Sequence, residues 1–222
     1  YLRGIGTVSN PATRILDSMD PPTEALLGVA GAIAVGKESL LEDRVRLLLA
    51  TGAAPVWVEE LMLQSVLMVG YPRALVAAGV WRRVSGLPAP SRDSDSTGPG
   101  EWLSRGEETC RAIYRLNYDR LRTNVRQLHP ALDTWMVTEG YGRVIAREGL
   151  DLARRELGTV VQLAVLGSPR QLHSHLRGAL QVGAGSGVID RALEIAGRDA
   201  SPAAATEAAA VWQQVRKMRE TT

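Results

Sequence analysis

A shift of 131 residues aligns the chain with itself without a gap. Under this shift Trp81 falls on Trp212, and the rarity of tryptophan makes such a match informative. The other identical pairs are Leu26 and Leu157, Gly36 and Gly167, Leu41 and Leu172, Arg46 and Arg177, Leu49 and Leu180, Gly52-Ala53 and Gly183-Ala184, Ala74 and Ala205, Ala77 and Ala208, Ala78 and Ala209, Val80 and Val211, and Val84 and Val215. The chain is therefore predicted to contain two copies of one unit, 23–85 and 154–216, each burying part of its apolar face against the other.

The pattern along the chain predicts an all-α protein, because Pro, Gly and Ser punctuate it and strict apolar/polar alternation is scarce. Helices are expected near 23–35, 40–51, 55–69, 72–84, 101–128, 131–146, 150–166, 169–182, 186–197 and 202–219. The predicted organisation is an N-terminal lead-in (1–22), a first, degenerate repeat (23–85), a polar and mobile linker (86–100), middle helices (101–149), and a second repeat carrying the site (150–219).

Composition excludes several classes of function. The net charge is only +2 and no basic tract is interleaved with aromatic residues, so a nucleic-acid partner is not expected. The apolar run Ala25 to Val35 is shorter than the about 20 residues that span a bilayer, and residues 1–15 have no apolar core of signal-peptide type. The short apolar run predicts no membrane partner. With Cys110 as the single cysteine an internal disulfide cannot form, so a cytoplasmic location is predicted.

The second repeat carries a recognisable series of residues. Glu156 precedes GTVVQLAVLG, and SPRQLHSHLRGALQVGA follows, in which Leu172, His175, Arg177 and Gly183 are spaced as L-x-x-H-x-R, ending in Gly. This segment resembles the carboxymuconolactone decarboxylase family, which shares its helical fold with the AhpD alkylhydroperoxidases. The resemblance implies a tandem pair of such helical units, and it implies further assembly into a homo-oligomer, since single-unit members associate through their helices.

The chain departs from the hydroperoxidase members at one motif. Those members carry C-x-x-C four and seven residues before the His, and here the two positions are Gln171 and Ser168. Without two thiols a dithiol–disulfide cycle cannot run at this place. What the resemblance leaves is a Glu/His pair of the decarboxylase type.

Glu156 and His175 are the candidate catalytic residues. They lie on consecutive helices joined by a short turn, so antiparallel packing would bring them face to face as an acid/base pair. The alternative is a plain hydrogen bond that ties two helices together. The first repeat has Ala25 and Arg44 at the matching positions, so one site per chain is predicted.

Three further residues are candidates for binding a substrate. Arg177 recurs as Arg46, which favours a structural ion pair, while its functional interpretation is a clamp for a substrate carboxylate. Tyr141 and Arg143 precede the second repeat and could line the mouth of a pocket. His173 and His175 point to opposite sides of a helix, so no metal site is predicted.

The resemblance implies an enzyme that acts without a cofactor on a small carboxylated, unsaturated lactone or related acid. A second hypothesis is an AhpD-like, peroxidase-related protein that uses Cys110, whose neighbour Arg111 would lower the thiol pKa. Burial of Cys110 as a small apolar residue is the competing interpretation. A third hypothesis is a non-catalytic helical module for binding or assembly.

Overall fold

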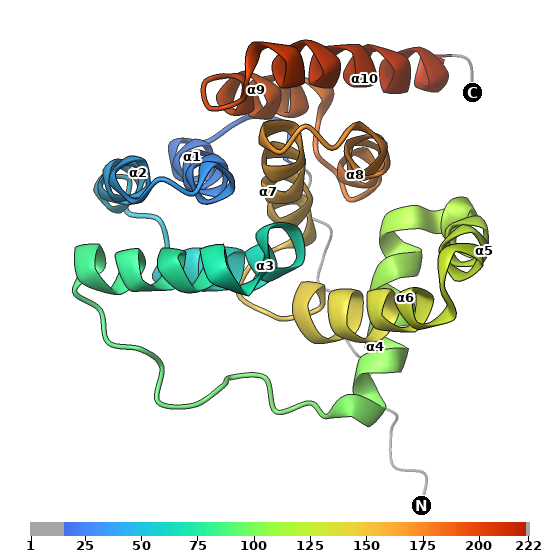
Figure 1. Cartoon of the computed structure of the whole chain (residues 1–222), viewed down its shortest axis with the longest axis horizontal. Coiled ribbons are helices and arrows are strands. Elements are labelled where there is room, and N and C mark those ends of the chain that lie inside the picture. The colour runs from blue at the N-terminus through green and yellow to red at the C-terminus, as the bar shows by residue number, and fades with distance from the viewer. Residues whose placement is uncertain (1–15, 221–222) are drawn as a thin grey trace, which may run out of the picture.

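The computed structural model describes residues 16–220, with side chains up to 218, and this part of the chain is all-α (Figure 1). Within it, extended pairing is limited to one bridge between Leu16 and Ala184. The helices are α1 (Pro21–Val35), α2 (Glu38–Ala50), α3 (Pro55–Ser85), α4 (Pro99–Tyr114), the 3-10 turn η1 (Arg115–Asn117), α5 (Tyr118–Leu128), α6 (Pro130–Trp135), the π-helix η2 (Met136–Ile145), α7 (Leu152–Val165), α8 (Pro169–Gln181), α9 (Ser186–Gly197) and α10 (Pro202–Glu220).

Helix bounds recur at the offset found in the sequence. The helices α1, α2 and α3 begin at Pro21, Glu38 and Pro55, and α7, α8 and α9 begin 131 residues later. A left-handed glycine ends the first helix of each unit, Gly36 with φ 78° and Gly167 with φ 64°. The two units therefore have the same helix order, while their origin by duplication stays a prediction.

The long helix α3 contains a kink where two helices were expected. Gly70 has φ 72° and ψ 170°, which is outside the helical region, and Pro72 follows inside the helix. Proline lacks a backbone donor and clashes with the preceding turn, so the helix changes direction here. The kink occupies the place that the break between α9 and α10 takes in the second unit.

The middle region differs most from expectation, because the single helix predicted at 101–128 is interrupted. Arg115 adopts φ 47° and ψ −120°, and it divides the segment into α4, η1 and α5. Leu116 and Leu128, whose spacing would place them on the apolar face of one continuous helix, are 100% and 78% exposed. The predicted helix 131–146 is likewise divided, into α6 and η2.

Two glycines allow α4 and η2 to pack with their backbones in contact. A Cβ atom at Gly106 would lie 2.0 Å from the carbonyl oxygen of Val137, and one at Gly142 would lie 1.8 Å from that of Trp102. Neither position can carry a side chain without moving the backbone. This contact fixes the middle helices as one layer beneath the second unit (Figure 1).

The segment between α3 and α4, predicted to be a mobile linker, makes hydrogen bonds and ion pairs in its second half. Asp95 bonds Arg105 at 3.0 Å and Thr97 at 2.6 Å, and Asp93 accepts a bond from Arg147 at 2.9 Å. Arg147 also bonds the buried Glu60 of α3 at 3.1 Å. The segment is therefore attached to the core through charged side chains.

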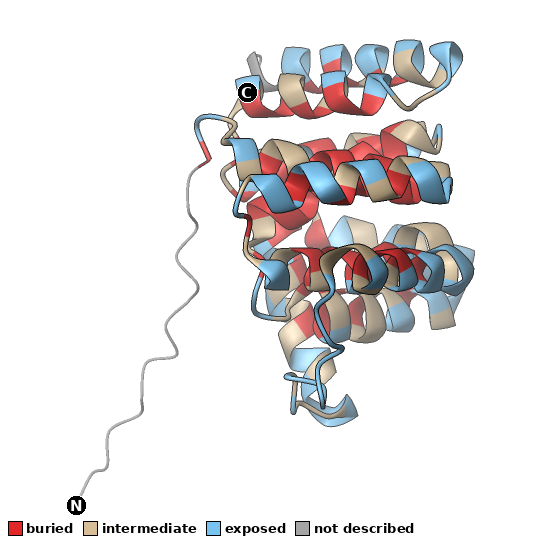
Figure 2. Cartoon of the chain, turned by 90° about the vertical axis from the view of Figure 1, so that its left-hand side faces the viewer, coloured by how far each residue is buried: buried red, intermediate tan, exposed pale blue. Residues whose placement is uncertain are grey.

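Helix α7 lies at the centre of the molecule and packs against α1, α3, α8 and α9. Buried residues cluster on the facing sides of the helices around it (Figure 2). Even its charged residues are buried: Arg155 bonds Glu60 at 2.8 Å, and Arg154 bonds Asp20 at 2.9 Å. The central helix thus holds Glu156 among buried, hydrogen-bonded side chains.

Among the described residues, α3 is the one helix long and apolar enough to cross a membrane by length and composition. The longest uninterrupted apolar run of the sequence, Ala25 to Val35, lies in α1 and not in this helix. Several polar residues of α3 face α7 instead: Gln64 bonds the carbonyl oxygen of Arg155 at 2.7 Å, and Ser65 accepts a bond from Gln162 at 2.7 Å. These buried bonds are what a helix in a protein core makes.

Candidate functional site

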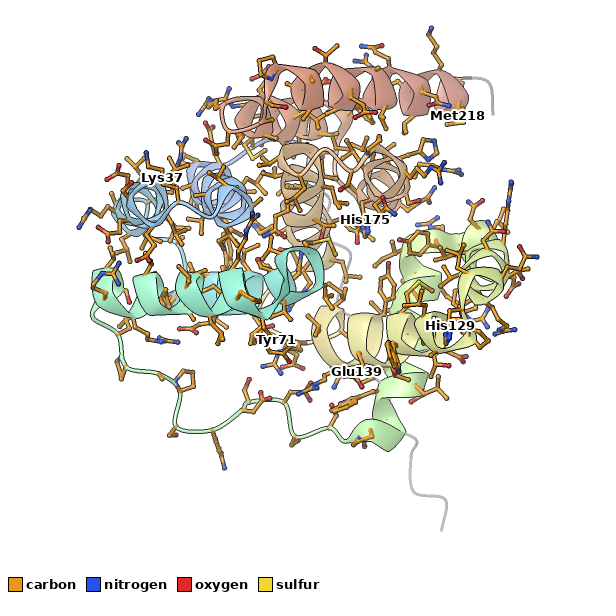
Figure 3. The ribbon with its side chains drawn as sticks, viewed as in Figure 1. Lys37, Tyr71, His129, Glu139, His175 and Met218 are labelled. Atoms are coloured by element: carbon orange, nitrogen blue, oxygen red, sulfur yellow. The ribbon has the colours of Figure 1, made fainter. Side chains whose placement is uncertain are left out.

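Glu156 and His175 are in direct contact. The turn at Gly167 folds α8 back on α7, and the Nδ1 atom of His175 lies 2.9 Å from the Oε2 atom of Glu156. Glu156 is 1% exposed, and the side chain of His175 is 15% exposed. Figure 3 shows His175 on the side of α8 that faces the middle helices.

The contact fixes how the imidazole can act. When Glu156 is ionised, its carboxylate only accepts hydrogen bonds, so the Nδ1 atom of His175 is then the donor of this bond. The other ring nitrogen, Nε2, is then left for proton exchange with a bound molecule. This is the usual arrangement of a histidine that is oriented by an acidic residue.

A cavity of about 430 Å³ opens beside this pair, between the middle helices and the second unit. Its lining residues come from α4, η1, α5, α8 and α10: Ile113, Tyr114, Asn117, Arg120, Leu121, Asn124, His173, Ser174, Arg177, Gly178, Gln181, Gln214 and Met218. The volume suits a small organic molecule. Figure 3 labels Met218 on α10, at the far side of α8 from the middle helices.

Gly178 connects the cavity to the Glu/His pair. It lines the cavity, and a Cβ atom placed on it would lie 2.6 Å from Oε2 of Glu156 and 2.9 Å from Cγ2 of Ile113. His175 is not itself among the lining residues, but it stands three positions earlier on α8, on the same face as Gly178. The Glu/His pair therefore borders the cavity at Gly178, and the side chain of His175 remains 15% exposed.

The cavity has a positive electrostatic character. Arg120 and Arg177 line it, no acidic residue does, and within the described part of the chain neither arginine has an ion-pair partner within 4.0 Å. His173 also lines it, and burial together with the charge of Arg177 lowers the pKa of this histidine. An anion would be attracted to such a cavity.

Comparison with the first repeat explains why Arg177 lacks an ion pair. Its counterpart Arg46 lies 3.6 Å from Glu42 and 3.8 Å from Asp43 on the same helix. The positions matching these acids in the second repeat are His173 and Ser174, which carry no negative charge. The ion pair expected for Arg177 on structural grounds does not form in the described structure, and its guanidinium group faces the cavity instead.

Tyr141 and Arg143 are placed differently from one another. Tyr141 is 7% exposed and reaches the cavity only through Tyr114, whose hydroxyl oxygen lies 2.8 Å from its own. Arg143 lies apart from the cavity, paired with Glu139 at 3.2 Å and stacked over the ring of Trp102. The structure thus brings Tyr141 near the site and does not bring Arg143 there.

Tyr114 and Arg120 line the cavity and were not identified from the sequence. Both lie outside the two repeats, in the segment expected to be one uninterrupted helix. Their place in the cavity depends on the break at Arg115, for which the sequence shows no proline or glycine. No local signal could have pointed to them.

Cys110 is fully buried, and this burial raises the pKa of its thiol to about 12, with the charge of Glu156 adding to the effect and Arg122 opposing it. The thiolate that a peroxidase nucleophile requires is strongly disfavoured in such surroundings. The structure supports the interpretation of Cys110 as a small apolar core residue.

The corresponding place in the first repeat holds different chemistry. Arg44, which matches His175, bonds Asp199 of the second unit at 3.4 Å, and Ala25 stands where the second repeat has Glu156. A Glu/His pair at this place therefore occurs once in the two units.

The described residues contain no group of three or more His, Cys, Asp or Glu side chains arranged to hold a metal ion.

Residues 130–214 match the model of the carboxymuconolactone decarboxylase family. The match covers α6, η2 and most of the second unit, including Glu156, His175, Arg177 and Tyr141. It does not extend to the first unit or to α4 and α5, which supply one wall of the cavity. No curated protein sequence matches the chain significantly.

Proposed function

Because residues 130–214 match the model of the carboxymuconolactone decarboxylase family, we propose that this chain is an enzyme of that type, acting on a small carboxylated, unsaturated lactone or related acid. The observation that carries the proposal is the bond between His175 and the buried Glu156 beside a positively charged cavity. A second candidate, a non-catalytic module of the same fold, would have no need for a buried acid/base pair behind an open cavity.

The proposed reaction is a decarboxylation. The bond between the carboxylate carbon and the ring breaks, carbon dioxide leaves, and the electron pair moves into the conjugated carbonyl group to give a dienolate. The protonated imidazole of His175 then delivers a proton from Nε2 to the dienolate carbon, and it regains one from water. Glu156 holds the ring in place and stabilises the imidazolium form. No cofactor is required by this scheme.

The unpaired arginines support an anionic substrate. Arg177 would hold an acid group that stays on the molecule, since a clamp on the departing carboxylate would stabilise the ground state and oppose its loss. A planar guanidinium group suits a carboxylate in two-point contact. The peroxidase alternative is weakened by the buried neutral thiol of Cys110 and by the absence of cysteine at Ser168 and Gln171.

The experiment is an assay of carbon dioxide release from a panel of carboxylated unsaturated lactones. The variant His175→Ala should lower the rate by about 10²-fold or more, the usual contribution of a positioned general acid. His173→Ala is the matched control, because this histidine lines the same cavity without contacting Glu156 and should change the rate far less.

Circular dichroism and thermal unfolding should show that both variants keep the fold. If His175→Ala releases carbon dioxide as fast as the unaltered protein, His175 is only a helix tie and the proposal is wrong. If no lactone in the panel releases carbon dioxide, the non-catalytic module becomes the better interpretation.

A further inference from the structure

We propose that Tyr114, oriented by Tyr141, is a further catalytic residue whose hydroxyl group donates a hydrogen bond to the substrate oxygen on which negative charge develops. The inference rests on the proposed function, since it assigns a role within that reaction. It concerns a residue of α4, outside the segment that matches the family model.

The two tyrosines form a hydroxyl pair at the edge of the cavity. Their hydroxyl oxygens are 2.8 Å apart, and their rings meet edge to face with centroids separated by 5.9 Å. Tyr114 lines the cavity, whereas Tyr141 lies behind it with 7% exposure. Of the two tyrosines, Tyr114 is therefore the one that borders the space for a bound molecule.

Burial decides which hydroxyl donates to the other. Within the described structure the hydroxyl of Tyr141 bonds only that of Tyr114, and a buried donor left without an acceptor destabilises the fold. Tyr141 therefore gives its proton to the oxygen of Tyr114. Since a hydroxyl has a single hydrogen and two acceptor sites, Tyr114 keeps its own proton free to point into the cavity.

The backbone holds Tyr114 in this place. It is the last residue of α4, and Arg115 directly after it has φ 47°, the one positive φ outside glycine among the described residues. Arg115 donates to the carbonyl oxygen of Gln181, at the end of α8, over 3.1 Å. This bond ties the end of α4 to the helix that carries His175, and strained backbone of this kind is frequently found at functional sites.

The surroundings keep the donor protonated. Burial raises the pKa of the Tyr114 hydroxyl far above its ordinary range, and the negative charge of Glu156 raises it further. The pKa of Tyr141 is raised by the same two causes and by its partner. Both hydroxyls are therefore neutral donors at neutral pH, and the charge of Glu156 raises both pKa values.

The arrangement places two different groups around one bound molecule. The Glu/His pair borders Gly178 of α8, and Ile113, which precedes Tyr114 in the chain, packs against the same glycine. A dienolate in the cavity would receive its proton from His175 at carbon and a hydrogen bond from Tyr114 at oxygen. A fixed donor aimed at such an oxygen stabilises the transition state more than the ground state.

The kinetic test compares Tyr114→Phe, Tyr141→Phe and the exposed control Tyr71→Phe. Loss of one oxyanion donor lowers kcat by about 10²–10³-fold, and we expect this for Tyr114→Phe with KM nearly unchanged. Tyr141→Phe should have a smaller effect on kcat, because the donor remains and only its orientation is lost. Tyr71 is 64% exposed and distant in the chain from Tyr114 and Tyr141, so its variant should match the unaltered protein.

A binding measurement separates this inference from the proposed function. The probe is 4-nitrophenolate, whose visible absorption maximum moves to shorter wavelength when its oxygen accepts a hydrogen bond. The shift is measured relative to the probe bound to Tyr114→Phe, which lacks the donor. We expect the probe bound to the unaltered protein or to Tyr71→Phe to absorb at a shorter wavelength than this reference, and the probe bound to Tyr141→Phe to lie in between. This pattern supports the donor role even if every lactone assay is negative.

Two results would overturn the inference. One is an identical absorption maximum for the probe bound to Tyr114→Phe and to the unaltered protein. The other is an unchanged kcat for Tyr114→Phe on a lactone that the unaltered protein decarboxylates, which would leave the function proposed for His175 standing and remove only the role of Tyr114.

Discussion

Gly178 has no side chain at the point where the cavity meets Glu156. We predict that Gly178→Ala separates Glu156 from His175, because the added Cβ atom would lie 2.6 Å from Oε2 of Glu156. The carboxylate is the far end of a flexible side chain, so it can move aside at small cost to the fold. Carbon dioxide release should therefore fall by about 10-fold or more, the scale of a displaced catalytic group.

The control for this substitution is Gly187→Ala in α9, where an added Cβ atom meets nothing within 4 Å. Both variants should unfold at temperatures close to that of the unaltered protein. An unchanged rate with Gly178→Ala would show that the Glu/His contact is not needed for the reaction, and a collapse of stability would show that the glycine serves packing alone.

The candidate residues differ in how far the sequence could reveal them. The contact between Glu156 and His175 was predictable, since two helices joined by a short turn must pack antiparallel and a separation of 19 positions brings their faces together. Tyr114 was not, because its position depends on the backbone of Arg115 and on a hydroxyl contact 27 residues away in the chain. Long-range contacts of this kind leave no periodic signal in one sequence.

At the level of elements, the segment 86–98 is held by the charge of Asp95. Burial alone would raise the pKa of this carboxyl group, but bonds from Arg105 and Thr97 outweigh it and lower the pKa to about 2. A carboxyl group whose folded pKa lies below its unfolded value contributes stability above that unfolded value, 3.8 here, and loses it as the pH falls through about 2.

We therefore predict that Asp95→Asn lowers the free energy of unfolding by up to about 2 kcal/mol at neutral pH, following the size of the pKa shift. The difference between the variant and the unaltered protein should vanish as the pH falls from about 4 to about 2. Urea denaturation at a series of pH values measures this. A difference that stays constant across the series would mean that packing, and not charge, attaches the segment.

The helices themselves were predictable where glycine and proline mark their ends. Gly36, Gly52 and Gly167 all adopt positive φ at the ends expected for helices, and the expected all-α class is confirmed. The middle region was not predictable in detail, since the contact of α4 with η2 requires Gly106 and Gly142 to face each other across 36 residues. A pattern read along one helix cannot identify which glycine allows a second backbone to approach.

For the molecule as a whole, the two units differ on their outer faces. Leu63, Leu67 and Leu75 of α3 are exposed, while the matching positions in the second unit are Glu194, Arg198 and Thr206. Because the same helical scaffold accepts polar residues there, the fold does not require the apolar face of α3. Contiguous exposed apolar residues often mark a contact between proteins.

We predict that this face contributes to the homo-oligomer expected from the sequence. Leu75 is 67% exposed, so Leu75→Glu should lower the molecular mass measured by light scattering after size exclusion without lowering the thermal unfolding temperature. Thr206→Glu, at the matching position of α10, is the control and should leave the mass unchanged. A monomeric unaltered protein would contradict the prediction, and an unchanged mass for Leu75→Glu would assign the interface to another face.

The buried bonds between α3 and α7 have a consequence for a chain that has been cut. Residues 87–92 are exposed, so a protease can reach the backbone there, between the first unit and the rest. The two fragments would still share the pairing of Glu60 with Arg155 and of Gln64 with Thr159 across the divide. Covalent continuity at this loop is therefore dispensable to the folded state, and the halves should reassemble from separately expressed polypeptides as a nicked but native protein.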